Sequence, residues 1–385
     1  MEDEGTKIRK FEGATTALIT PMEDNGKVDE FSLGKLIEFN TASGIHNLVV
    51  NGTTAQSPTL SVHEAEKLLT STLYSMTIHK NKVPVIFGAG SNDMKKSAKL
   101  TQMAAQNGAD ATLHVTGYYN MPPQIGMLRH FSACAAASEF PLIMYDVPVR
   151  GHPVIKPETR IEAALLNPGK IIGVKDATGG KYVEYNEEKG CDEEKNMWEE
   201  TVRQAREGGL DRHQFKLISG DDSKTYEIMS KYEGVGVISV TSNIFPGAVS
   251  QMVELLLAGE NAEAKSIDDA LAPFNNVLKV KRISYLYPSG RRVKDDAFAN
   301  PAPVQFAAYA LGMIGSDRLE LPLVGLSEDI IPMKERVVPS EARIQVLDTL
   351  ESMYYSNPEL FKPIEEFYNV DVKARLTLFR EPARE

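Results

Sequence analysis

Short runs of apolar and β-branched residues recur along the chain, separated by segments with helical periodicity. Each run is too short for a helix, and its apolar residues are nearly continuous rather than alternating with polar ones. Such runs are typical of strands that are buried on both faces of a parallel sheet. They lie at residues 17–20, 47–50, 83–87, 111–115, 141–145, 171–175, 215–219 and 235–240.

The segments between these runs carry helix signals. Asp29 can cap one helix, Ser61 and Glu64 form a capping box for another, and a third begins near Pro246 and ends at Gly259. A strand followed by a helix, about eight times, predicts an α/β fold: a closed (β/α)8 TIM barrel with a C-terminal helical extension. A doubly wound open sheet is the rival, but no Gly-x-Gly-x-x-Gly turn follows the first run, which disfavours its dinucleotide-binding form.

Three segments look like additions to a barrel. Residues 181–213 are highly charged, and we expect a solvated helix with loops there. Residues 282–296 mix aromatic and basic side chains, and the tail after Gly325 contains helical runs. We therefore expect a barrel over 1–243, with the charged insertion, and a C-terminal helical region packed on it over 244–385.

Composition narrows the partners and the compartment. The net charge of -11 disfavours nucleic acid, and no apolar stretch approaches the roughly 18 residues that span a bilayer. The acidic N-terminus fits neither a secretory nor a transit peptide, so we expect a cytoplasmic protein. Cys134 and Cys191 form no Cys-x-x-Cys pair and the seven histidines show no ligand spacing. We therefore expect free thiols and no metal.

The polar residues that end each run are the candidates for chemistry, because active sites of such barrels lie at the C-terminal strand ends. Lys175 ends a run predicted to be buried, where desolvation favours the neutral amine that attacks a ketone. The alternative is a lysine that reaches the rim or pairs with Asp176. Tyr145 ends the preceding run, roughly 4.8 Å away, and can carry protons for that amine. It can equally be a core aromatic with its hydroxyl bonded locally.

Two further strand ends carry candidate binding groups. Thr53 and Thr54 follow Gly52, where backbone N–H groups can bind a carboxylate and a hydroxyl can relay a proton; a simple helix-capping turn is the alternative. Arg150 offers a guanidinium fork for a substrate carboxylate, unless it is an ordinary surface arginine. Three interpretations of Tyr119 are open: a residue of a lid, of the core or of an interface.

With these residues assembled, the chain resembles the dihydrodipicolinate synthase / N-acetylneuraminate lyase family of class I aldolases. The resemblance runs from about Gly13 to Glu328. It implies a TIM-barrel enzyme that needs no metal or organic cofactor and assembles as a dimer or tetramer. Its stretches, in order, are GATTALITPM, NGTTAQSPTLS, VTGYYNMPP, YDVPVRG, GVKDATGG, KLISGDD, GVGVISVTSN, NPAPVQ and LPLVGLSE.

The resemblance also implies roles for the catalytic candidates. Lys175 looks like the lysine that forms a Schiff base with pyruvate, and Tyr145 like the tyrosine that relays its protons. Thr53 and Tyr119 look like relay partners, with Tyr119 reaching the site of a neighbouring subunit.

Four positions look like substrate contacts. Thr54 resembles the pyruvate carboxylate binder, and Arg150 the arginine that holds the carboxylate of the aldehyde. Gly220 and Ile238 resemble backbone contacts around the pyruvate-derived carbons. The doubled threonine and Arg150 favour the synthase branch, and so condensation of pyruvate with L-aspartate 4-semialdehyde for lysine and diaminopimelate synthesis.

Several residues depart from the family pattern. Ala55 and Gln56 replace a usual Gly-Glu, Asp146 a usual Asn and Gly151 a usual Thr, while Gln305 stands where Lys is common. These departures leave the residues for imine chemistry unchanged, but the identity of the aldehyde substrate stays open. An aldolase for a sugar acid or for N-acetylneuraminate is therefore an alternative. A non-catalytic scaffold barrel and a metal-dependent aldolase are hypotheses of other classes.

The resemblance further locates a feedback site for L-lysine. One of its acidic positions is occupied by Lys96, which would repel the ammonium group of lysine. We therefore expect weak or no inhibition by L-lysine. The aligned positions are Ser57, Val62, Ala65, Asn92, Lys96 and Tyr118.

Overall fold

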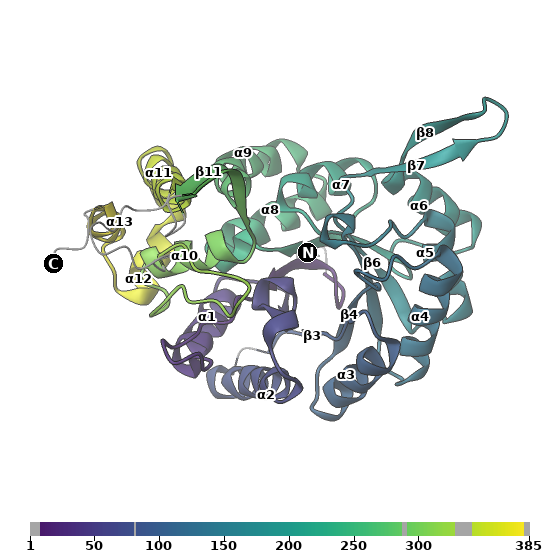
Figure 1. Ribbon diagram of the computed structural model, residues 1–385, viewed down its shortest axis with the longest axis horizontal. Helices are drawn as coiled ribbons and strands as arrows, with labels where there is room; N and C mark the ends of the chain where they lie inside the picture. The colour runs from purple at the N-terminus through teal and green to yellow at the C-terminus, as the bar shows by residue number, and fades with distance from the viewer. Residues whose placement is uncertain (1–7, 81, 287–290, 328–340, 381–385) are drawn as a thin grey trace, which may run out of the picture.

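Eight parallel strands pair edge to edge into a closed barrel in the computed structural model, which describes residues 8–80, 82–286, 291–327 and 341–380 (Figure 1). The order around the barrel is β1-β10-β9-β6-β5-β4-β3-β2. The predicted TIM barrel is therefore confirmed, and the open sheet is excluded. The strands are β1 (Gly13–Ala17), β2 (Asn47–Val50), β3 (Val85–Gly88), β4 (Ala111–Val115), β5 (Leu142–Asp146), β6 (Ile171–Asp176), β9 (Lys216–Ser219) and β10 (Gly236–Ser239).

The first strand lies earlier than its apolar run. It was predicted at 17–20, but β1 ends at Ala17, because its centre consists of buried threonines rather than aliphatic residues. Thr16 donates a 2.7 Å hydrogen bond to Asn40 Oδ1, and Asn47 donates a 3.1 Å bond to Thr15 Oγ1. Hydroxyls that are hydrogen-bonded inside the protein can be buried in a strand, so hydrophobicity alone misplaces it.

A ring of helices surrounds the barrel (Figure 1). The predicted caps are confirmed: Asp29 accepts from the backbone of Ser32, the Ser61–Glu64 capping box is complete, and the helix from Pro246 ends at Gly259. None of the described helices combines the length and the hydropathy needed to cross a bilayer. The ring is α1 (Glu30–Ala42), α2 (Val62–His79), α3 (Met94–Gln106), α4 (Gln124–Ala136), α5 (Pro157–Leu166), α6 (Met197–Glu207), α7 (Thr225–Lys231) and α8 (Pro246–Ala258).

The charged insertion differs from its prediction. Besides the helix α6, it forms an antiparallel hairpin of β7 (Lys181–Asn186) and β8 (Cys191–Asn196), which projects away from the barrel (Figure 1). Cross-strand ion pairs hold it, such as Lys181 to Glu194 at 2.6 Å. Opposite charges stabilise strand pairing without any apolar alternation, so the hydrophobic pattern gives no strand signal here.

The C-terminal segments form a helical layer on one side of the barrel (Figure 1). Phe39 of α1 contacts Phe367 and Tyr368, with ring centroids 5.2 and 5.4 Å apart. The segment 282–296 lies in a hairpin, of which 287–290 are outside the described residues. The layer contains α9 (Asn261–Val277), β11 (Lys279–Leu286), β12 (Arg292–Ala299), α10 (Ala302–Ala310), α11 (Glu341–Ser356), α12 (Lys362–Tyr368) and α13 (Val372–Arg380).

Alternation along the strands divides the core into two layers. Ile143 and Tyr145 of β5 belong to the cluster inside the barrel, whereas Leu142 and Met144 pack outward against the helices. Asp146 continues this alternation and points outward. The inner layer receives residues from every strand of the barrel, and it is where a substrate site at the strand ends must begin.

Candidate active site

Lys175 and Tyr145 lie side by side near the C-terminal ends of β6 and β5. The two residues are register partners, and their exposed fractions are only 6% and 8%. The Lys175 Nζ is 4.3 Å from the centroid of the Tyr145 ring. The structure therefore brings together the two residues that the strand positions predicted to be neighbours.

A buried ion network holds the two strand ends from the outer side of the barrel. Arg160 of α5 donates hydrogen bonds of 2.6 Å to Asp146 and 2.7 Å to Asp176. These carboxylates directly follow Tyr145 and Lys175, and the side chains of all three charged residues are fully buried. The network thus fixes the backbone that carries the candidate catalytic pair.

The network has one more negative than positive charge, and this affects Asp146. Burial raises the pKa of Asp146 to about 6, Arg160 opposes the rise, and Asp176 adds to it. Burial alone would lower the pKa of Arg160, but the two carboxylates raise it overall. Sequence reasoning missed Arg160. The available signal was an arginine among the apolar residues of a helix that lies between two strands ending in aspartate.

Thr54 and Arg150 are joined by a residue to which the sequence assigned no role. Thr54 lies in the short helix η1 (Thr53–Ala55) and Arg150 in η3 (Pro148–Arg150). Asn300, just after β12, donates a 3.0 Å hydrogen bond to Thr54 Oγ1, and its backbone oxygen accepts a 2.9 Å bond from Arg150 Nη2. Asn300 therefore couples the two predicted carboxylate binders.

A cavity of about 170 Å³ opens beside these groups. Thr53 and Arg150 line it, together with Val115 and Val147, which flank Tyr145 across and along the strands. Lys175 is not among the lining residues. Of the expected feedback positions, the cavity also collects Ser57, Val62, Ala65, Lys96 and Tyr118.

The remaining predicted positions are spread around the barrel mouth. Tyr119 is 88% exposed and has a left-handed backbone with φ of 69°. Ile238 is buried in β10. The Gly220 N–H donates to the carbonyl of Asp176 at 2.7 Å, and a Cβ atom on Gly220 would lie 2.9 Å from that oxygen. Gly220 therefore also has a structural reason to be glycine.

Comparison with known proteins decides the family. The pattern of the Dihydrodipicolinate synthetase family matches residues 10–340. The chain belongs to this family. It is a lyase-type enzyme, as the resemblance predicted, and its curated relatives carry the synthase name.

Individual members of the dihydrodipicolinate synthetase family agree in sequence and fold. The 4-hydroxy-tetrahydrodipicolinate synthase of Parvibaculum lavamentivorans is 36% identical over 317 residues, which cover 82% of this chain and 94% of that protein. The chloride-inhibited dihydrodipicolinate synthase of Acinetobacter baumannii, solved with pyruvate, is 29% identical with a TM-score of 0.71 and coverages of 89% and 99%. The synthase of Cyanidioschyzon merolae, solved with lysine bound, is 27% identical with a TM-score of 0.71 and coverages of 90% and 99%.

Proposed function

We propose that this enzyme condenses pyruvate with L-aspartate 4-semialdehyde to 4-hydroxy-tetrahydrodipicolinate through a Schiff base on Lys175, in the cytoplasm and without a metal or organic cofactor. The observation that carries the proposal is the buried Lys175 amine 4.3 Å from the centroid of the Tyr145 ring, at paired strand ends. Attack of the amine on the keto carbon and loss of water give the imine. Loss of a methyl proton then gives an enamine, whose carbon adds to the aldehyde carbon while the aldehyde oxygen takes up a proton. The amino group of the semialdehyde then attacks the imine carbon, which closes the ring and releases Lys175 as the free amine.

The neighbouring groups divide the proton transfers and the binding. Tyr145 carries the protons that carbinolamine formation and dehydration require, and Thr53 continues the relay. The Thr54 backbone and hydroxyl bind the pyruvate carboxylate, while Gly220 and Ile238 surround the pyruvate-derived carbons. Their positions at or near the C-terminal ends of barrel strands support these roles.

We assign Tyr119 to the active site of a partner subunit in a homodimer or homotetramer. Its side chain is exposed, and its backbone amide donates to the Gly151 carbonyl at 2.8 Å, which anchors the residue in its left-handed conformation. An exposed aromatic side chain on an anchored backbone is a typical interface residue. Tyr119→Phe should lower turnover at unchanged assembly, and Tyr119→Ala should also weaken the dimer in analytical ultracentrifugation.

Borohydride trapping tests the Schiff base directly. Reduction in the presence of pyruvate should add mass to the peptide containing Lys175, and Lys175→Ala should lose the adduct and nearly all turnover. Lys216 provides a matched control, since it is also buried in the barrel and burial lowers the pKa of its amine. An adduct on Lys216, or an active enzyme without an adduct on Lys175, would contradict the assignment.

The aldehyde is tested by competing substrates. Aspartate semialdehyde, N-acetylmannosamine and glyceraldehyde are assayed side by side with pyruvate. Arg150 favours the carboxylate-bearing semialdehyde, so Arg150→Ala should raise the KM for that aldehyde far more than the KM for pyruvate. Preference for a sugar would instead identify another branch of the family.

We further propose that L-lysine inhibits this enzyme weakly or not at all. The cavity that collects the feedback positions is lined by Lys96, Val62 and Ala65, which offer a positive charge and apolar groups to an incoming ammonium. Turnover should be nearly constant over a millimolar lysine titration. An inhibition constant in the micromolar range would refute the proposal.

A further inference from the structure

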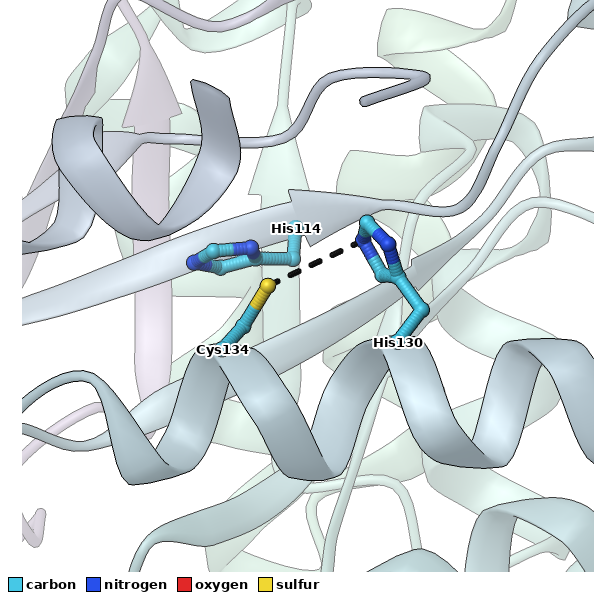
Figure 2. Close-up of side chains that lie close together, drawn as sticks. All are labelled: His114, His130 and Cys134. Carbon is cyan, nitrogen blue, oxygen red and sulfur yellow. Dashed lines mark hydrogen bonds between the residues drawn. The ribbon is translucent and has the colours of Figure 1, made fainter. Parts of the chain in front are cut away.

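Three side chains able to bind a metal ion meet on the outer side of the barrel wall, between β4 and α4. Figure 2 shows the Cys134 sulfur between the rings of His114 and His130. One ligand atom from each residue lies within 4.8 Å of the others, and Cys134 Sγ is 3.8 Å from His130 Nε2. We propose that this cluster binds a zinc-type transition-metal ion through two imidazoles and one thiolate.

The hydrogen bonds of His114 leave one ring nitrogen available to an ion. When the Thr101 hydroxyl donates its proton to the carbonyl of Ser97, 2.9 Å away, it accepts from His114 Nε2 at 3.1 Å. In this tautomer, Nε2 carries the proton and Nδ1 presents a lone pair. Nδ1 has no hydrogen-bond partner among the described residues, although His114 is completely buried. A buried acceptor without a partner is costly, and a bound ion would provide one.

Metal binding requires the thiolate form of Cys134. The thiol would release its proton to solvent as the ion binds, because the charge of the ion stabilises the thiolate.

The competing interpretation is a hydrogen bond between Cys134 and His130 without an ion. That bond accounts for His130, but it leaves His114 Nδ1 unpaired. Tetrahedral zinc separates its nitrogen and sulfur ligands by about 3.5 Å, given bond lengths of about 2.0–2.3 Å. The observed 3.8 Å between Cys134 Sγ and His130 Nε2 needs little adjustment.

An entry route and a fourth position adjoin the cluster. His130 lines a cavity of about 430 Å³ together with Asn92, Asn120 and Arg129. The negative charge of Asp93 acts on His130, so one carboxylate would partly balance an incoming cation. A water molecule in the cavity can complete three-ligand zinc. The positive charge of Arg129, which also lines this cavity, would repel an incoming cation.

The site would tie α4 to β4 rather than take part in catalysis. His114 points to the helix side of the wall, while the next residue, Val115, packs against the inner layer near Tyr145. The loop 116–123 between β4 and α4 carries Tyr119. A bound ion would therefore tie together the strand before and the helix after the loop that we assign to the subunit interface.

Metal binding is tested on the full chain after removal of metals with a chelator. Titration with Zn²⁺ should give one site per chain, and Co²⁺ should give a thiolate-to-cobalt charge-transfer band. Cys134→Ala and His130→Gln should lose both signals. Thr101→Val, which removes the partner of His114 Nε2, should weaken zinc binding by about 10- to 100-fold.

Two exposed residues of the same kinds provide the controls. Cys191→Ser and His63→Gln should bind zinc like the parent chain, since both residues are exposed and distant in sequence from the cluster. Turnover of pyruvate with the aldehyde verifies that each variant is folded. The inference fails if the parent chain binds no zinc, if binding survives Cys134→Ala in folded protein, or if Cys191→Ser abolishes it.

Discussion

Replacing Arg160 by methionine should destabilise the enzyme more than any change at an exposed arginine. The guanidinium makes hydrogen bonds to Asp146, Asp176, the Ile155 carbonyl and Thr201 Oγ1, at 2.6, 2.7, 2.9 and 3.1 Å. Methionine fills most of the volume but makes none of these bonds. Two fully buried carboxylates then face each other without a cation.

The expected cost depends on pH. Removing one partner of a buried ion pair typically costs about 3–5 kcal/mol. Protonation of Asp146 limits this cost. Because its pKa is about 6, adding a proton to this carboxylate at pH 7 costs only about 1.4 kcal/mol. Losing Arg160 raises this pKa further, so the folded variant binds more protons than the unfolded chain. The contribution of Asp146 to the stability of the variant should therefore be fully present below about pH 4 and be lost as pH rises through the folded pKa.

Urea unfolding followed by circular dichroism at pH 7.5 and 5.5 measures the effect. Arg160→Met should lose about 3 kcal/mol at pH 7.5, the lower end of the range for a buried ion pair because Asp146 can take up a proton, and clearly less at pH 5.5. Adding Asp146→Asn should restore part of the loss. Arg203→Met is the control, because the ion pairs of Arg203 with Glu200 and Glu207 are exposed and contribute little. A loss below about 1 kcal/mol, or the same loss at both pH values, would refute the ion network as the support of these strands.

Three other changes test separate parts of the site. Asp146→Asn alone should be tolerated, and should remove a penalty of up to about 3 kcal/mol that the parent chain acquires as pH rises from about 4 to 6; unfolding at both pH values checks this. Asn300→Ala removes the bond to Thr54 and should raise the KM for pyruvate more than it lowers kcat, whereas an unchanged KM would separate Asn300 from binding. Gly220→Ala should lower the free energy of unfolding by about 1–3 kcal/mol, because the new methyl group would crowd the carbonyl of Asp176. Gly34→Ala should be neutral or stabilising in thermal unfolding, because it lies in a helix and its new Cβ atom would be 3.5 Å from Ser75 Oγ, an ordinary contact.

The barrel was predictable because most of its strands are continuous aliphatic runs. The exceptions have physical causes in polar pairing. β1 is built on Thr15 and Thr16, whose burial depends on amide partners that come from other elements. The hairpin over 181–196 is held by charge pairs across its strands. Neither interaction leaves a hydrophobic period, so both escape an analysis of apolar spacing.

The site was predictable to the extent that strand order defines it. Lys175 and Tyr145 each end a run, so their adjacency follows from consecutive parallel strands. Asn300 and Thr54 are 246 positions apart, and Arg160 joins two aspartates that belong to different strands. A single sequence gives no distance between such positions. The metal-ligand cluster escaped for the same reason, although His130 and Cys134 are four residues apart on one helix.

Alternation along the strands also separates two kinds of chemistry. Tyr145 faces the inner layer, while His114 on the adjacent strand faces the helices. A change on one side should therefore leave the other side intact. Lys175→Ala should abolish turnover but retain zinc, and Cys134→Ala should lose zinc but still form the pyruvate adduct. If Cys134→Ala also prevented the adduct in folded protein, the barrel wall would couple the two sites, and the cluster would belong to the catalytic machinery.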